Sequence, residues 1–333
     1  MTMLAIKPIG GSNVASSRLR AYLPVEHLRK AGVDIEIYKP ENKNKYNAII
    51  FQKAYTESDI EIAKRTKDSG RAVILDQCDN HFIFDQENKM LLERADRMKQ
   101  MASISDALLV STKEIAKLYP QKTTVVVPDY IEIPKTRLVS CLKADLKYRN
   151  CFNPASIKLV WFGNSGSSNP KFGMCDIAEK IPELNQVSTH YNIQLSIISN
   201  SKEKFDHFFN TKCRFQVHYI KWKEDTFYHL LKKHDICLLP VGVNPFTICK
   251  TNNRITLSIL AGLPTLADEI PSYSEFRDYV RFSNWFFNLK QMIENLPEEN
   301  LRTRKGIDYI NTNYSEQAIT QRWIRALETL RII

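Results

Sequence analysis

The sequence has little glycine and proline, and it has no apolar run long enough to cross a membrane. Ten glycines and 14 prolines in 333 residues exclude a collagen-like or proline-rich chain. The longest apolar stretches, such as Ile236 to Leu239, fall far short of the roughly 20 residues that a membrane-spanning helix needs. A short apolar run and a glycine pair stand at the amino terminus, where a signal peptide would have a long apolar segment. We therefore expect a cytoplasmic globular protein.

Paired cysteine motifs are also absent. The seven cysteines form no C-x-x-C pair and their number is odd, so the sequence indicates neither a disulfide framework nor a zinc site. We expect no metal and no cofactor. Positive charge, in contrast, is in excess: 47 Lys and Arg against 37 Asp and Glu give a net charge of +10. This excess indicates an anionic partner such as a nucleotide, an anionic membrane surface or nucleic acid, and charge alone does not choose among them.

Short apolar strands alternate with helical segments along almost the whole chain, which predicts an α/β protein with parallel sheets covered by helices. The alternation runs twice. The expected strands of the first half are Met3–Ile9, Val33–Tyr38, Ala48–Phe51, Ala72–Leu75, Ala107–Val110 and Thr124–Val127; those of the second half are Lys158–Phe162, Ile193–Ile198, Gln216–Ile220, Asp235–Leu239 and Thr265–Ala267.

The alternation fades where prolines 128, 134 and 154 occur, so we place a domain boundary there. The first domain is expected over 1–135, a linker over 136–156, and the second domain over 157–314. Two Rossmann-like, doubly wound domains facing a central cleft are the simplest architecture.

Ligands of open parallel sheets bind beyond the carboxyl ends of the strands, so the loops after strands are the candidate sites. One such loop begins at Gly10–Gly11 and leads to Arg18, where an anion could meet backbone and guanidinium groups. The corresponding loop of the second domain contains Gly163, Asn164, Ser165 and Gly166. Neither loop matches G-x-G-x-x-G, and glycine after a strand is also ordinary turn chemistry.

Asp76, Asp79 and His81 cluster after the expected strand Ala72–Leu75. A carboxylate or imidazole at this place could act as a general base, orient an acceptor hydroxyl or stabilise positive charge developing on a sugar ring. The alternative is a helix cap beside a buried histidine. The cluster lacks a recognised metal-ligand spacing.

Two further features of the second domain could bind a nucleotide. Trp222, between two lysines, could stack on a base, although a core tryptophan is a common alternative. Lys250 and Arg254 lie four residues apart at an expected helix start, so they would share one face if both are helical. Helix dipole and backbone N–H groups favour phosphate there.

Several of these segments together resemble the GT-B glycosyltransferases, particularly the bacterial family 1 and family 4-like enzymes that build surface polysaccharides. The stretch from Ser16 to Tyr38 looks like their first helix and second strand, and ILDQCDNHF resembles their aspartate-rich strand end. WFGNSG resembles the glycine loop of their nucleotide-binding domain. The segment from His234 to Ala267 resembles their phosphate-contacting helix and small-Gly-x-Pro turn. The resemblance spans nearly the full chain.

The resemblance implies transfer of a sugar from a nucleotide-diphosphate sugar to an acceptor hydroxyl without a metal. It implies diphosphate binding by Lys250, Asn253 and Arg254 with the glycine loop, and Gly11 and Arg18 facing the acceptor. The terminal helix, about 315–333, would pack back on the first domain. Many retaining members carry a Glu-x7-Glu pair, but the corresponding residues here are Cys249 and Leu257, so the stereochemistry stays open.

The acceptor would be a glycan or a lipid-linked glycan, which makes peripheral binding to the inner membrane face a further expectation. One alternative is a nucleotide-sugar epimerase, because fold does not determine reaction. Another is a non-catalytic protein that binds nucleotide sugars or nucleic acid. Against nucleic acid, the aromatic residues are not interleaved with a basic stripe.

Overall fold

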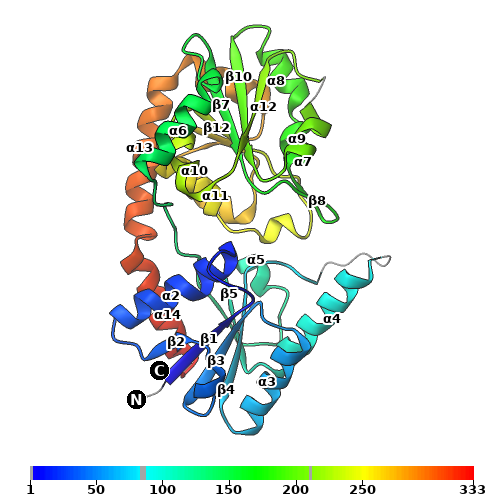
Figure 1. Cartoon of the computed structure of the whole chain (residues 1–333), viewed down its shortest axis with the longest axis vertical. Helices are drawn as coiled ribbons and strands as arrows, with labels where there is room; N and C mark the ends of the chain where they lie inside the picture. Colours follow the sequence, from blue (N-terminus) through cyan, green and yellow to red (C-terminus); the bar gives the residue numbers. More distant parts are fainter. Residues whose placement is uncertain (1–2, 83–87, 210–211) are drawn as a thin grey trace. The chain divides into compact units, whose positions relative to one another are not determined.

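The computed structural model describes residues 3–82, 88–209 and 212–333. These residues form two compact units (Figure 1). The first contains residues 1–132, the short segment 248–251 and the terminal segment 312–333; the second contains 133–247 and 252–311. Each unit has its own six-stranded sheet. The prediction of an α/β protein with two parallel-sheet domains is confirmed.

The sheet of the first unit is parallel throughout, in the strand order β2-β1-β3-β4-β5-β6. Its central strands are continuous apolar runs because helices cover both of their faces. The strands are β1 Met3–Pro8, β2 Ile35–Ile37, β3 Tyr46–Gln52, β4 Ala72–Gln77, β5 Ala107–Val110 and β6 Thr124–Val126. The helices are α1 Ala15–Ser17, η1 Arg18–Tyr22, α2 Leu23–Lys30, η2 Pro40–Asn42, α3 Glu57–Asp68, α4 Lys89–Ile104, α5 Lys113–Ala116 and α14 Glu316–Thr329.

The terminal helix α14 packs against α2 in this unit. A buried arginine anchors it: the Arg20 guanidinium lies 5.1 Å from the ring of Trp323 on α14 and pairs with Asp76 of β4. All three side chains are fully buried. Burial alone would lower the pKa of Arg20, but the neighbouring carboxylates raise it, so the side chain stays charged.

The sheet of the second unit is also parallel, in the order β11-β10-β7-β12-β13-β14, and β8 and β9 form a separate antiparallel hairpin. The strands are β7 Ile157–Phe162, β8 Gly166–Ser168, β9 Lys171–Gly173, β10 Ile193–Ser199, β11 Gln216–Lys221, β12 Ile236–Leu239, β13 Thr265–Ala267 and β14 Arg281–Phe282. The helices are α6 Leu138–Lys147, η3 Arg149–Cys151, α7 Met174–Ala178, α8 Ile181–Val187, α9 Lys202–Phe209, α10 Glu224–Leu231, η4 Thr247–Cys249, α11 Asn253–Leu260, η5 Pro271–Phe276, α12 Trp285–Glu294 and α13 Leu296–Asn313.

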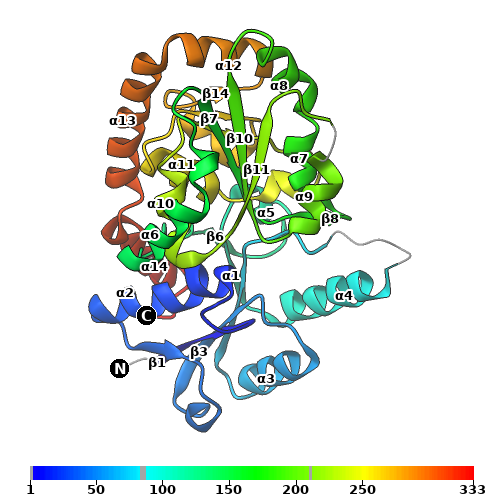
Figure 2. The same ribbon diagram turned by 45° about the horizontal axis from the view of Figure 1, so that its top comes forward.

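Residues 136–156, which we expected to be a linker, instead contain the helix α6 and the turn η3. This helix lies against α10 of the second unit (Figure 2). Cys141 and Ala144 of α6 are buried, and Asp145 pairs with His229 and Lys233. The prolines that suggested a linker lie before and after the helix, so they do not interrupt it.

Candidate functional site

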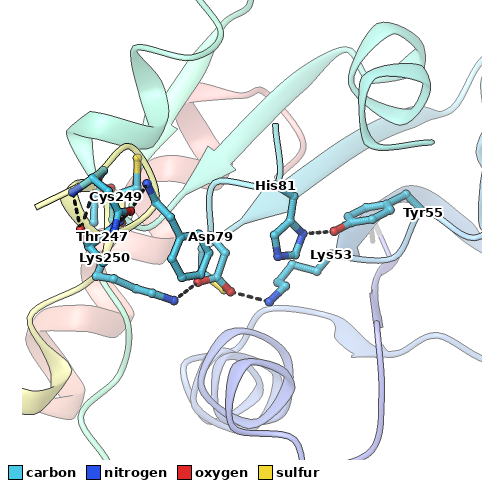
Figure 3. A network of polar contacts seen from close by, with 11 residues as sticks. Lys53, Tyr55, Asp79, His81, Thr247, Cys249 and Lys250 are labelled. Atoms are coloured by element: carbon cyan, nitrogen blue, oxygen red, sulfur yellow. Dashed lines mark hydrogen bonds and ion pairs between the residues drawn. The ribbon is translucent and has the colours of Figure 1, made fainter. Parts of the chain in front are cut away.

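In the first unit, register brings the carboxyl ends of β3 and β4 together, because Gln52 lies opposite Asp76. The residues that follow these strands therefore meet. Lys53, directly after β3, forms an ion pair of 2.5 Å with Asp79, which lies in the loop after β4. The same carboxylate forms a second ion pair, of 2.6 Å, with Lys250, which lies in the segment 248–251 (Figure 3). One carboxylate thus holds two ammonium groups.

These two lysines determine the ionisation of Asp79. Burial alone would raise the pKa of its carboxyl, but Lys250 and Lys53 lower it well below the usual range. Lys53 itself adopts a left-handed backbone, with a φ of 51°, which non-glycine residues rarely adopt. Such backbone strain occurs preferentially at functional sites. Two lysines and one aspartate give the cluster of Lys53, Asp79 and Lys250 a formal charge of +1.

His81 lies in the same loop and is buried beside Tyr55, to whose hydroxyl its Nδ1 is hydrogen-bonded (Figure 3). Burial and the nearby charge of Lys53 lower the pKa of His81 to about 3, so its imidazole is neutral at physiological pH. Burial raises the pKa of Tyr55 to about 12, so this phenol keeps its proton. Tyr55 and His81 are therefore a neutral hydrogen-bonded pair beside the charged cluster of Lys53, Asp79 and Lys250.

Asp76, a catalytic candidate from the sequence, lies apart from this chemistry. Its side chain is fully buried and is bound by Arg20 through Nε, at 3.2 Å, and through Nη2. Asp76 thus lies within β4 and pairs with a buried arginine, whereas Asp79 and His81 lie in the loop after that strand. A catalytic role of Asp76 stays a prediction.

The acceptor-side candidates Gly11 and Arg18 are in the first unit. Gly11 is exposed. Arg18 forms an ion pair of 2.5 Å with Glu132 and donates to the Ser12 carbonyl at 2.9 Å. These contacts connect the loop after β1 to the irregular segment that follows β6.

In the second unit, the glycine loop follows β7. Gly163 and Asn164 stand at its start, and Ser165 is buried, with its backbone N–H bound by Asn200. Gly166 has a φ of +80°, and a Cβ atom there would lie 1.7 Å from the carbonyl oxygen of Phe172. Gly166 is therefore required for the close approach of β8 and β9.

Arg254, in the first turn of α11, packs its guanidinium on two aromatic rings of β7. Its Cζ lies 5.2 Å from the Trp161 ring and 5.7 Å from the Phe162 ring. A Cβ atom at Gly163 would lie 3.5 Å from the same Cζ, so the glycine loop and the arginine are neighbours. The nitrogens Nε and Nη2 are buried and have no hydrogen-bond partner among the described residues. Buried charged donors nearly always have a partner, so these two nitrogens are candidates for contact with a ligand.

Lys250 does not share this helix face. The helix α11 begins at Asn253, and Lys250 lies before it, paired with Asp79. The expected four-residue pair of Lys250 and Arg254 on one helix is therefore wrong. The turn η4 ends at Cys249, and α11 starts only after the bend at Asn252, its N-cap. Asn253 is the first helical residue, next to Arg254.

Two further features lie at the carboxyl ends of strands in the second unit. Trp222, directly after β11, is 41% exposed, which is unusual for a core tryptophan. A cavity of about 350 Å³ lies beyond β12, β13 and β14 and includes Asp176, Gly242, Asp268 and Glu269 in its lining. These acidic residues were not among the candidates from the sequence, although Asp268 and Glu269 directly follow the strand β13, as the other candidate loops follow theirs.

Within the described residues, no group of three or more His, Cys, Asp and Glu side chains is arranged to hold a metal ion. In that same part of the chain, no helix is both long and apolar enough to cross a membrane.

No family model matches the sequence, and no curated protein matches it. Solved structures do. HepE from Anabaena, determined in complex with UDP and glucose, has a TM-score of 0.68 at 11% identity, covering 99% of this chain and all of that one. WaaG, a glycosyltransferase involved in lipopolysaccharide biosynthesis, has a TM-score of 0.59 at 15% identity, covering 95% and 98%. Sucrose-phosphate synthase from Thermosynechococcus elongatus has a TM-score of 0.64 at 10% identity, covering 99% of each chain. The fold is GT-B, as the sequence predicts.

Proposed function

We propose that this chain is a glycosyltransferase that moves a sugar from a nucleotide-diphosphate sugar to an acceptor hydroxyl. The observation that carries the proposal is Arg254, a cation with two buried, unpaired nitrogens in the first turn of a helix. Helix N-termini attract anions through their backbone N–H groups and dipole, and guanidinium binds phosphate oxygens in a two-pronged contact. HepE, which shares the fold, has also been determined in complex with UDP-glucose.

The donor is assigned to the second unit. Arg254 and Asn253 at the start of α11, together with Gly163 and Asn164, hold the diphosphate. Trp222 stacks on the base, because its exposed ring lies at the carboxyl end of a strand. The acidic cavity beyond β12 and β13 takes the sugar, whose hydroxyls donate hydrogen bonds to carboxylates.

The reaction is assisted by stabilising the leaving group. Negative charge grows on the diphosphate as the glycosidic bond breaks, and Arg254 and the helix start are already placed where that charge develops. These groups supply the role that a divalent cation has in other enzymes, so we propose a metal-independent transfer.

On the first unit, Asp79 and His81 orient the acceptor without removing its proton. As the acceptor oxygen bonds to the anomeric carbon and the bond from that carbon to the diphosphate breaks, the hydroxyl proton passes to the departing diphosphate. Asp79 is engaged by two ammonium groups, and the neutral imidazole of His81 is a weak base because its pKa is about 3. The acceptor is a glycan or a lipid-linked glycan, consistent with the role of WaaG in lipopolysaccharide biosynthesis.

A thermal-shift screen of nucleotide-diphosphate sugars tests the donor assignment, because a ligand that binds the native state raises the apparent melting temperature. We expect at least one nucleotide sugar to raise the apparent melting temperature of the wild type and to leave that of Arg254→Ala unchanged. A complete set of donors without any shift would contradict it. Conversion of a bound sugar to its epimer without transfer would favour the epimerase.

A further inference from the structure

The helix α6 carries an exposed apolar stripe. Leu138, Val139, Leu142 and Leu146 are 76%, 64%, 56% and 74% exposed. At about 100° per residue they fall within one arc of the helix surface. Scattered exposed apolar residues are normal, but four on one face of a ten-residue helix form a contiguous patch.

The opposite side of α6 is firmly attached to the second unit. Cys141 and Ala144 are buried, and the Asp145 carboxylate accepts from His229 at 2.8 Å and from Lys233 at 3.0 Å. The Arg137 backbone N–H also donates to the Asp225 carbonyl of α10. The stripe is therefore presented on a fixed helix, and it is not an unattached segment.

Basic residues surround the stripe. Five exposed cations lie on α6 or within three residues of its ends, and they are Lys135, Arg137, Lys143, Lys147 and Arg149. The only acidic residue in the helix, Asp145, is already neutralised by Lys233. These five cations form no ion pair within the described part of the chain, so apolar and positively charged side chains stand side by side. Such a surface fits a partner that is both apolar and anionic.

We propose that α6 docks this chain on an anionic lipid surface, with its leucines inserted between the lipid headgroups and its lysines bound to phosphates. An amphipathic helix with a leucine-rich face and a lysine-rich border lies in the plane of such an interface. Lysine side chains can lay their aliphatic part along the apolar stripe and keep the ammonium at the headgroups. A protein partner would satisfy the leucines but would need an acidic rim to match the five cations.

This inference is independent of the proposed transferase activity, because it uses no residue of the candidate site. Its test is the sedimentation of the full chain with vesicles of phosphatidylcholine, with and without phosphatidylglycerol. We expect binding to the phosphatidylglycerol vesicles, weakened by salt because the attraction is partly electrostatic.

The matched variants are Leu142→Asn/Leu146→Asn on the stripe and Leu301→Asn on α13, where Leu301 is 57% exposed. The stripe variant should bind about tenfold more weakly or worse, and Leu301→Asn should bind like the wild type. Lys143→Gln/Lys147→Gln should also lose about tenfold, because each cation near an anionic leaflet contributes to binding.

Circular dichroism must show all variants folded, which is expected because every substituted side chain is exposed. Equal vesicle binding by the wild type and both α6 variants would overturn the proposal. A wild type that binds no vesicles would also overturn it. If that wild type forms a dimer and the stripe variant does not, the stripe is an interface between copies.

Discussion

Replacing Arg254 by alanine should weaken the binding of a nucleoside diphosphate about a hundredfold. The magnitude follows from the two buried guanidinium nitrogens that have no partner among the described residues. A hydrogen bond to a charged group contributes about 1.5 to 3 kcal/mol, so two contribute at least about 3 kcal/mol. Each 1.4 kcal/mol is roughly a factor of ten in Kd. Arg254→Lys should recover only part of the loss, because an ammonium cannot make the two-pronged contact.

The assay is calorimetric titration of the nucleoside diphosphate of the best donor into the wild type, Arg254→Ala and Arg254→Lys. Arg304→Ala, which removes an exposed arginine of α13 in the same unit, is the control and should bind like the wild type. Circular dichroism should show all four proteins folded. Equal affinities of the wild type and Arg254→Ala would refute the diphosphate assignment, since the helix start would then bind no anion.

The buried ionic and polar clusters of the first unit lead to further predictions about stability. Asp79→Asn should lower the free energy of unfolding by about 2 kcal/mol, measured in urea, because it removes the negative charge that pairs with the largely buried ammonium of Lys53. Lys53→Met should cost more than Lys250→Met, since Lys53 is the more buried lysine; an equal cost would contradict the ion-pair geometry. His81 should make the fold sensitive to acid: its pKa is 6.5 when unfolded and about 3 when folded, so the unfolded chain takes up the proton first. Stability should therefore fall by about 1 kcal/mol per pH unit below pH 6.5 in the wild type relative to His81→Gln, and parallel urea midpoints for the two would refute it. Arg20→Ala should destabilise by about 3 to 5 kcal/mol, because Asp76 stays buried without its counter-charge; a loss below 1 kcal/mol would show that the pair is dispensable.

Strands were predictable from sequence where their apolar runs were continuous. The bounds expected for Ala107–Val110 and Thr265–Ala267 agree with β5 and β13, because both strands are buried on both faces. The hairpin of β8 and β9 was not predicted, because its short polar strands carry no apolar pattern. The helix α6 was hidden for a different reason: its leucines face outward, and the nearby prolines resembled those of a linker.

The candidate site was predictable as a set of loops but not as a set of contacts. The rule that loops after strands carry chemistry selected Asp79, His81 and Arg254. It could not show that Asp79 is held by Lys53, which follows a different strand. Helical spacing placed Lys250 beside Arg254, but spacing has meaning only inside a helix, and α11 begins after Lys250. Long-range pairing of charges decides the first case and the start of α11 decides the second, and neither can be read from residue spacing alone.

The most direct test of the proposed glycosyltransferase is to follow a labelled sugar. The chain is incubated with each nucleotide-diphosphate sugar, labelled in the sugar, and with a mixture of glycan and lipid-linked glycan acceptors, and the products are identified by mass spectrometry. The account predicts that the label appears on an acceptor together with free nucleoside diphosphate, and that Arg254→Ala produces neither. A label that stays on the nucleotide with every donor, or that is found there only as an epimer, would contradict it.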